Sequence, residues 1–136
     1  MITSLVEQWD KNKHNLESYL EQNHPKSYNE LVCILVEYVL TEPLRSGQSI
    51  DPNRIHMIDD GSYQGTEIYL LGLYCYQPTE IDYLWFSNSY GSCSGCDTLM
   101  AIRSYEYEDV PPTTKQVSEY MTLALHIVQR IKWLDE

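Results

Sequence analysis

Apolar residues in the first third of the chain recur at helical spacing. Residues 4–22 predict an amphipathic helix, because charged side chains avoid the stripe formed by Leu5, Trp9, Leu16 and Leu20. Pro25 sets the limit of this helix, since the residue before a proline avoids helical angles. Residues 28–40 predict a second helix, in which Ser27 and Glu30 have the spacing of a capping box.

The last part of the chain has the strongest helical pattern. Residues 115–134 follow a Pro-Pro pair, and Thr113 with Gln116 has the spacing of a second capping box. One apolar stripe runs through the segment and consists of Val117, Tyr120, Met121, Ala124, Val128 and Ile131. These features predict a C-terminal helix that packs against the core through this stripe.

The middle of the chain has the composition of β-strands. Branched and aromatic residues are concentrated in four segments, which are Arg54–Ile58, Glu67–Tyr76, Asp82–Ser89 and Thr98–Tyr105. Their short, turn-rich connections favour an antiparallel meander. The second and third segments are apolar on both faces, so we expect helices on one face and a tyrosine-rich surface on the other, where a partner or a second copy can bind. The predicted fold is one α+β domain, residues 1–136, with a four-stranded antiparallel meander, two N-terminal helices and one C-terminal helix.

Composition and charge narrow the classes of function. The chain has 136 residues, of which 43% are hydrophobic, so it can bury a core without disulfides. Its net charge of −11 repels phosphate backbones and argues against direct nucleic-acid binding. No signal-peptide pattern is present at the N-terminus, and the apolar run Leu31–Val36 is too short to span a membrane. We therefore expect a cytoplasmic protein with reduced cysteines and no membrane contact.

The segment Tyr90–Asp97 contains two cysteines that could bind a metal or form a redox pair. Cys93 and Cys96 form a C-x-x-C pair, in which both thiolates can reach one ion, so zinc is a possible cofactor. A complete site would need further ligands, for which the candidates are His56, Asp59, Asp60 and Asp97. The pair can also be a redox couple, but strand-like residues follow it, and nearby acids would raise a thiol pKa.

The backbone of the same segment offers two other interpretations. Gly91, Ser92, Ser94 and Gly95 are small residues whose successive N–H groups can form an anion-binding nest. The alternative is a tight hairpin without chemistry, in which the glycines supply the turn and the cysteines pack as small apolar residues.

A second polar loop covers residues 59–65. Its Asp-Asp-Gly start suits a metal-binding or hydroxyl-binding turn, or an ordinary Asp-Gly turn between strands. In a meander the first and third connections lie at the same end of the sheet, so we expect this loop beside residues 90–97. The candidate ligand-binding residues are therefore Asp59, Asp60, Tyr63, Gln64, Tyr90, Ser92, Ser94 and Asp97.

The segments 58–66 and 90–99 resemble a family of small proteins found often in bacteriophage genomes and also in bacteria. The resemblance covers roughly residues 54–102, and its more specific part is the run Tyr-Gly-Ser-Cys-Ser-Gly-Cys-Asp-Thr-Leu. It implies a phage or bacterial setting, in which the host cytoplasm would be the place of action, and it implies that the two loops belong together. It carries over no catalytic residue.

Three classes of function follow from these observations. The first is a small acidic phage-type protein that modulates a host process by capturing a host protein or a small signalling ligand at the loops 59–65 and 90–97. The second is a metal-dependent or thiol-dependent enzyme at the same loops. The third is an acidic DNA mimic, which would act through surface carboxylates and need no pocket.

Overall fold

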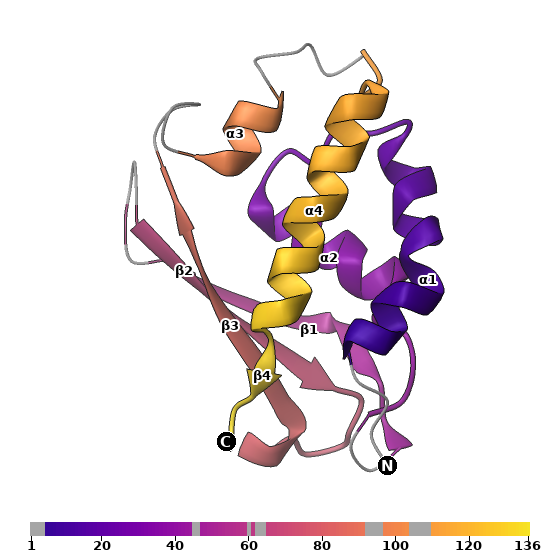
Figure 1. Cartoon of the computed structure of the whole chain (residues 1–136). Helices are drawn as coiled ribbons and strands as arrows, with labels where there is room; N and C mark the ends of the chain where they lie inside the picture. Colours follow the sequence, from indigo (N-terminus) through magenta and orange to yellow (C-terminus); the bar gives the residue numbers. More distant parts are fainter. Residues whose placement is uncertain (1–4, 45–46, 60, 62–64, 92–96, 104–109) are drawn as a thin grey trace.

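In the computed structural model of the protein, the described residues form four α-helices and four strands (Figure 1). The structure describes residues 5–44, 47–59, 61, 65–91, 97–103 and 110–136. A 3-10 turn, η2, covers Glu80–Asp82. The remaining elements in chain order are α1 (Leu5–Leu20), α2 (Tyr28–Tyr38), β1 (Ile50–Asp59), β2 (Gly65–Leu73), β3 (Tyr83–Tyr90), α3 (Thr98–Arg103), α4 (Thr114–Arg130) and β4 (Lys132–Trp133).

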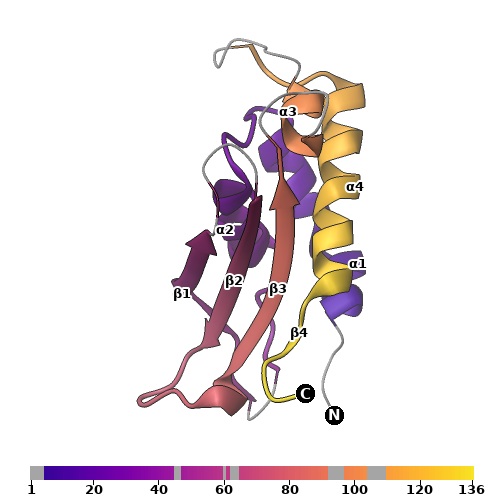
Figure 2. The ribbon, with the colours of Figure 1, turned by 90° about the vertical axis from the view of Figure 1, so that its left-hand side faces the viewer.

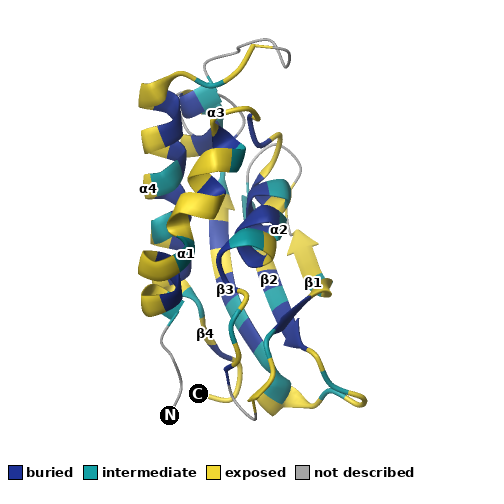
Figure 3. Ribbon diagram, turned by 90° about the vertical axis from the view of Figure 1, so that its right-hand side faces the viewer, coloured by how far each residue is buried: buried dark blue, intermediate teal, exposed yellow. Residues whose placement is uncertain are grey.

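The strands form one antiparallel sheet with the order β1-β2-β3-β4. The helices α1, α2 and α4 stand on one face of this sheet and leave its other face open (Figures 2 and 3). The predicted α+β class, the four-stranded antiparallel sheet, the two N-terminal helices and the C-terminal helix are confirmed.

Local capping explains where two of the helices begin. The Ser27 hydroxyl accepts a hydrogen bond from the backbone N–H of Glu30 at 3.1 Å. At the start of α4 the Thr113 hydroxyl accepts from the N–H of Gln116 at 3.1 Å, and the Gln116 side chain accepts from the N–H of Thr113 at 2.9 Å. The predicted capping residues therefore satisfy backbone donors that a helix end leaves free.

The fourth strand comes from a different segment than the sequence pattern indicated. Residues 98–105 were expected to be a strand, but Thr98–Arg103 is the helix α3. Asp97 caps this helix, because its carboxylate accepts from the N–H of Met100 at 3.1 Å. The buried residues Leu99 and Ile102 are three apart, as on one helical face. The fourth strand is instead β4, which extends from the end of α4 and pairs with β3.

The open face of the sheet also differs from the expectation of a tyrosine-rich surface. Its apolar side chains include Ile58 and Ile68, which are exposed, and Leu70 and Trp85, which are half-buried. Tyr69 lies on the helix-covered face and is fully buried. Alternation along a strand shows which residues share a face, but the pairing register and the position of the helices decide which face is covered. The sequence therefore did not determine whether Tyr69 lies on the covered or the open face.

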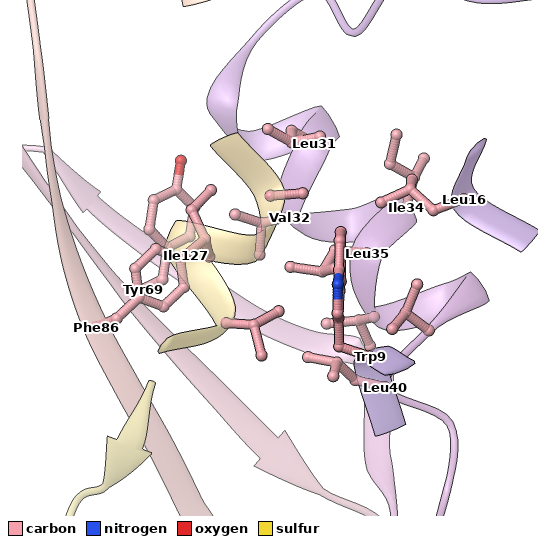
Figure 4. Close-up of a cluster of buried hydrophobic side chains, with 14 of the residues drawn as sticks. Trp9, Leu16, Leu31, Val32, Ile34, Leu35, Leu40, Tyr69, Phe86 and Ile127 are labelled. Atoms are coloured by element: carbon pink, nitrogen blue, oxygen red, sulfur yellow. The ribbon is translucent and has the colours of Figure 1, made fainter. Parts of the chain in front are cut away.

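The core lies between the helices and the sheet. One buried cluster contains Trp9 and Leu16 from α1, Leu31 and Leu35 from α2, and Ile127 from α4 (Figure 4). On the sheet side, the rings of Tyr69 and Phe86 stack with centroids 4.9 Å apart. Within the described residues, no helix is both long enough and apolar enough to cross a membrane.

Candidate functional site

The flanks of the two predicted loops meet at one end of the sheet. Tyr90, the last residue of β3, pairs with Gly65 at the start of β2. Its hydroxyl donates to the Asp59 carboxylate at 2.6 Å, and the N–H of Gly61 donates to the same oxygen at 2.9 Å. These hydrogen bonds, that of Tyr90 first, lower the pKa of Asp59. The ends of β1 and β3 are therefore bonded directly to each other, as the meander order requires.

Most of the predicted site residues lie outside the described part of the chain. They are the ligand-binding candidates Asp60, Tyr63, Gln64, Ser92 and Ser94 and the metal-ligand candidates Cys93 and Cys96. The flanking residues Asp59, Tyr90, Gly91 and Asp97 are described, and their hydrogen bonds fix the ends of both loops.

Asp97 anchors the second loop from a buried position. One of its carboxylate oxygens accepts from the N–H of Gly91 at 2.8 Å, which ties the two ends of the segment 91–97 together. The other oxygen accepts from the Tyr28 hydroxyl at 3.1 Å as well as from the N–H of Met100. Burial raises the pKa of Tyr28 to about 12, so this phenol stays protonated and can donate. Asp97, predicted as a ligand-binding residue, uses both oxygens to hold the loop and to cap α3.

Glu67 lies beside this anchor on the same face of the sheet. It pairs with Asp59 of β1 and with Asn88 of β3, and its carboxylate accepts from the buried Tyr69 hydroxyl at 2.6 Å. Burial raises the pKa of Glu67, and the nearby carboxylates of Asp59 and Asp97 raise it further. The sheet end therefore contains a carboxyl group that holds its proton more tightly than an exposed glutamate does.

Replacing Glu67 by Gln should remove a pH dependence of stability. The folded chain binds the Glu67 proton more tightly than the unfolded chain, and this difference in proton binding stabilises the fold. The stabilisation is complete below the ordinary pKa of 4.5 and is lost as pH rises through the raised pKa of the folded state. Urea unfolding between about pH 4.5 and about pH 8 should show the wild type losing stability relative to E67Q. A constant difference between the two proteins over this range would contradict the assignment.

The possible zinc site cannot be completed from the described residues alone. Among them, no group of three or more His, Cys, Asp or Glu side chains is close enough to hold an ion. Asp59 and Asp97 are engaged by the hydrogen bonds described above. His56 lies three residues before Asp59 on a regular strand and therefore points to the opposite face of the sheet. The described cysteines, Cys33 and Cys75, are free thiols.

A groove of about 630 Å³ opens next to this anchored end of the sheet. It lies between β3, α3 and α4, and Tyr28, which bonds to Asp97, also lines it. Its polar lining residues are Ser87, Asn88, Ser89, Thr98, Ser118, Glu119, Thr122, His126 and Arg130. The volume is in the range of pockets that hold small ligands or short segments of chain.

One wall of the groove is the edge of β3, where no strand of the described residues pairs beyond β4. β4 pairs only with Leu84 and Trp85 of β3, and the N–H of Leu134 donates to the carbonyl of Tyr83 at 2.9 Å. Backbone groups alternate in direction along an antiparallel strand, so those of Ser87 and Ser89 point to this same edge. Within the described chain no strand pairs with them, and both residues line the groove.

Asn88 and Arg130 connect this strand to the opposite wall. The Arg130 guanidinium donates to the Asn88 side-chain carbonyl at 3.0 Å. Asn88 is buried, and within the described residues its amide nitrogen has no hydrogen-bond partner. A buried unpaired donor costs about 1–3 kcal/mol, so a ligand oxygen that reached this amide would relieve a penalty.

Sequence reasoning missed these groove residues. Asn88 and Arg130 are 42 positions apart and match no motif. The free edge of β3 arises because β4 is only two residues long, which no local pattern indicates. Comparison of the chain with protein-family models, with curated proteins and with solved structures finds no match.

Proposed function

We propose that this is a binding protein that captures an extended segment of a partner protein by strand addition to the free edge of β3. The observation that carries the proposal is that Ser87 and Ser89 line the groove, while strand alternation directs their backbone groups to the edge of β3 where no described strand pairs with them. An added strand gains affinity from main-chain hydrogen bonds and specificity from its alternating side chains. From the sequence we expected capture of a host protein or a small signalling ligand at the loops 59–65 and 90–97, and the present proposal keeps the first of these two kinds of partner.

The chemistry of the groove indicates which segment it would accept. Arg130 and His126 lie at the end of the groove near the C-terminus of α4, whereas Glu119 lies toward the start of this helix. Arginine binds carboxylates through a planar fork of donors. The preferred segment would be extended, with an acidic side chain near Arg130, small polar side chains facing the hydroxyl-rich wall, and no proline opposite Ser87 or Ser89.

Proline at position 89 should abolish this binding while the fold persists. Ser89→Pro removes the outward N–H, and its ring obstructs an incoming strand, whereas proline is tolerated at an edge when its N–H site faces away from the sheet. Ser89→Ala is the matched control, because it removes the hydroxyl and keeps the N–H. Peptides selected on the wild-type protein from a displayed library of random heptapeptides should bind S89A with nearly unchanged affinity and S89P at least tenfold more weakly.

The same peptides test the role of Arg130. Those that contain Asp or Glu should lose at least tenfold in affinity on Arg130→Gln, while neutral peptides should lose less. Fluorescence polarisation measures each affinity, and circular dichroism checks that each variant is folded. If the selected peptides bind S89P as tightly as S89A, strand addition at β3 is wrong.

A further inference from the structure

A second cavity, of about 300 Å³, lies at the connection between α1 and α2. It shares no lining residue with the groove beside β3. Its lining residues are Tyr19, Asn23, His24, Lys26, Glu30 and Arg103. Among these described lining residues, two permanent cations, Lys26 and Arg103, accompany one carboxylate, Glu30, although the net charge of the chain is −11.

His24 forms a buried part of the cavity wall. Its Nδ1 lies 2.7 Å from the Tyr120 hydroxyl, and the two rings meet edge to face. Burial raises the pKa of Tyr120 to about 12, so the phenol keeps its proton. Within the described residues this O–H has only the imidazole as an acceptor, and the hydrogen-bond network therefore assigns donation to Nδ1.

This tautomer leaves the ring proton of His24 on Nε2. Within the described residues Nε2 has no hydrogen-bond partner, although His24 is only 8% exposed. A buried N–H without an acceptor is unfavourable, and native proteins rarely leave one. The cavity that His24 lines is the place from which an acceptor can come.

Arg103 brings α3 to the same cavity. One of its terminal nitrogens donates to the carbonyl of Lys26 at 3.2 Å, which joins the end of α3 to the connection between α1 and α2. The guanidinium has five N–H donors in a planar fork, and within the described residues most of them remain for a ligand after this contact. A fork of this kind matches the oxygens of a phosphate group.

We propose that the cavity binds a small phosphate-bearing anion. Arg103 would contact two of its oxygens, Lys26 would add a point charge, and the Nε2–H of His24 would donate to a third oxygen. Glu30 can accept a hydrogen bond from a protonated phosphate oxygen or from a hydroxyl of a phosphate ester. The volume is at the lower end for ligand pockets, so the cavity suits a phosphate with few further atoms.

Titration with inorganic phosphate in about 150 mM NaCl tests this site, because salt at that level screens unspecific attraction. Two-dimensional NMR of the labelled protein should show a saturable shift of the His24 ring nitrogens. Arg103→Gln should weaken phosphate binding at least tenfold, and Arg103→Lys, which keeps the charge without the fork, should weaken it less. Lys26→Gln should weaken it severalfold. Circular dichroism and a melting curve confirm that each variant is folded.

Variants in the groove make this test independent of the proposed peptide binding. Arg130→Gln and Ser89→Pro should leave the phosphate titration unchanged, since neither residue lines the cavity. Glycerol phosphate in place of inorganic phosphate should give the same dependence on Arg103 if the site accepts esters; a response to free phosphate alone would assign it to the inorganic ion. No saturable shift, an undiminished response in folded R103Q, or a loss confined to R130Q would overturn the proposal.

Discussion

Asp97→Ala should lower the free energy of unfolding by about 3–5 kcal/mol, because the change leaves several buried donors without an acceptor. The carboxylate accepts from the N–H of Gly91, the N–H of Met100 and the hydroxyl of Tyr28. Loss of the cap on α3 alone would cost about 1 kcal/mol, and the unpaired groups account for the rest. Urea unfolding at neutral pH, followed by circular dichroism, measures the difference.

Two control variants separate this effect from a general loss of charge. Asp97→Asn keeps one oxygen acceptor but turns an amide toward backbone donors, so its loss should lie between those of the wild type and D97A. Asp10 is exposed, and its ion pair within the described residues is a 4.0 Å contact with Lys13, so Asp10→Ala should change stability by less than about 0.5 kcal/mol. A loss below about 1 kcal/mol in D97A would mean that water replaces the carboxylate and that Asp97 is not the anchor of the loop.

Phe86→Ala should cost about 3–5 kcal/mol, which is the usual loss when a buried aromatic side chain is truncated. Phe86 is 1% exposed and lies on β3, where its ring stacks on Tyr69 at an interplanar angle of 9°. The change removes this contact and opens a cavity where the sheet meets the helices. A drop of roughly 10 °C or more in the melting temperature should accompany it.

The neighbouring residue on the same strand provides a matched control. Trp85 is larger than Phe86 but points to the open face, where Lys132 lies 4.8 Å from its ring centroid. Trp85→Ala should therefore cost less than half as much as Phe86→Ala, despite the larger deletion. Equal losses would indicate that a partner or a second copy covers the open face, and a concentration-dependent melting temperature would identify the second copy.

Local signals were enough to predict most of the elements. The stripe in residues 115–134 and the Thr113–Gln116 capping box depend on neighbours three or four positions apart, and α4 begins where they indicate. The branched and aromatic residues and the turns in the middle of the chain likewise predicted β1, β2 and β3, although β1 begins at Ile50, four residues before its expected start. Such features depend on short stretches of chain, which is why a single sequence contains them.

The predicted proximity of the two loops followed from topology and needed only three strands. Successive antiparallel strands place the end of β1 and the end of β3 together, whatever follows them. The hydrogen bond between Tyr90 and Asp59, 31 positions apart, joins these two ends. The mistaken strand at 98–105 did not affect this result, because α3 begins beyond the end of β3.

Tertiary structure alone decided the rest. The six residues of α3 contain Leu, Met and Ile in a run that suits a strand as well as a helix. Asp97 is a local cap that permits the helix, and burial of Leu99 and Ile102 with α3 packed against α4 selects it. The groove, the free edge of β3 and the cavity at His24 join residues from distant parts of the chain, as in the His24–Tyr120 contact across 96 positions. Periodicity determines which face of an element is apolar. Only the packing of these faces determines which polar groups are buried together and which remain available to bind a ligand or a partner.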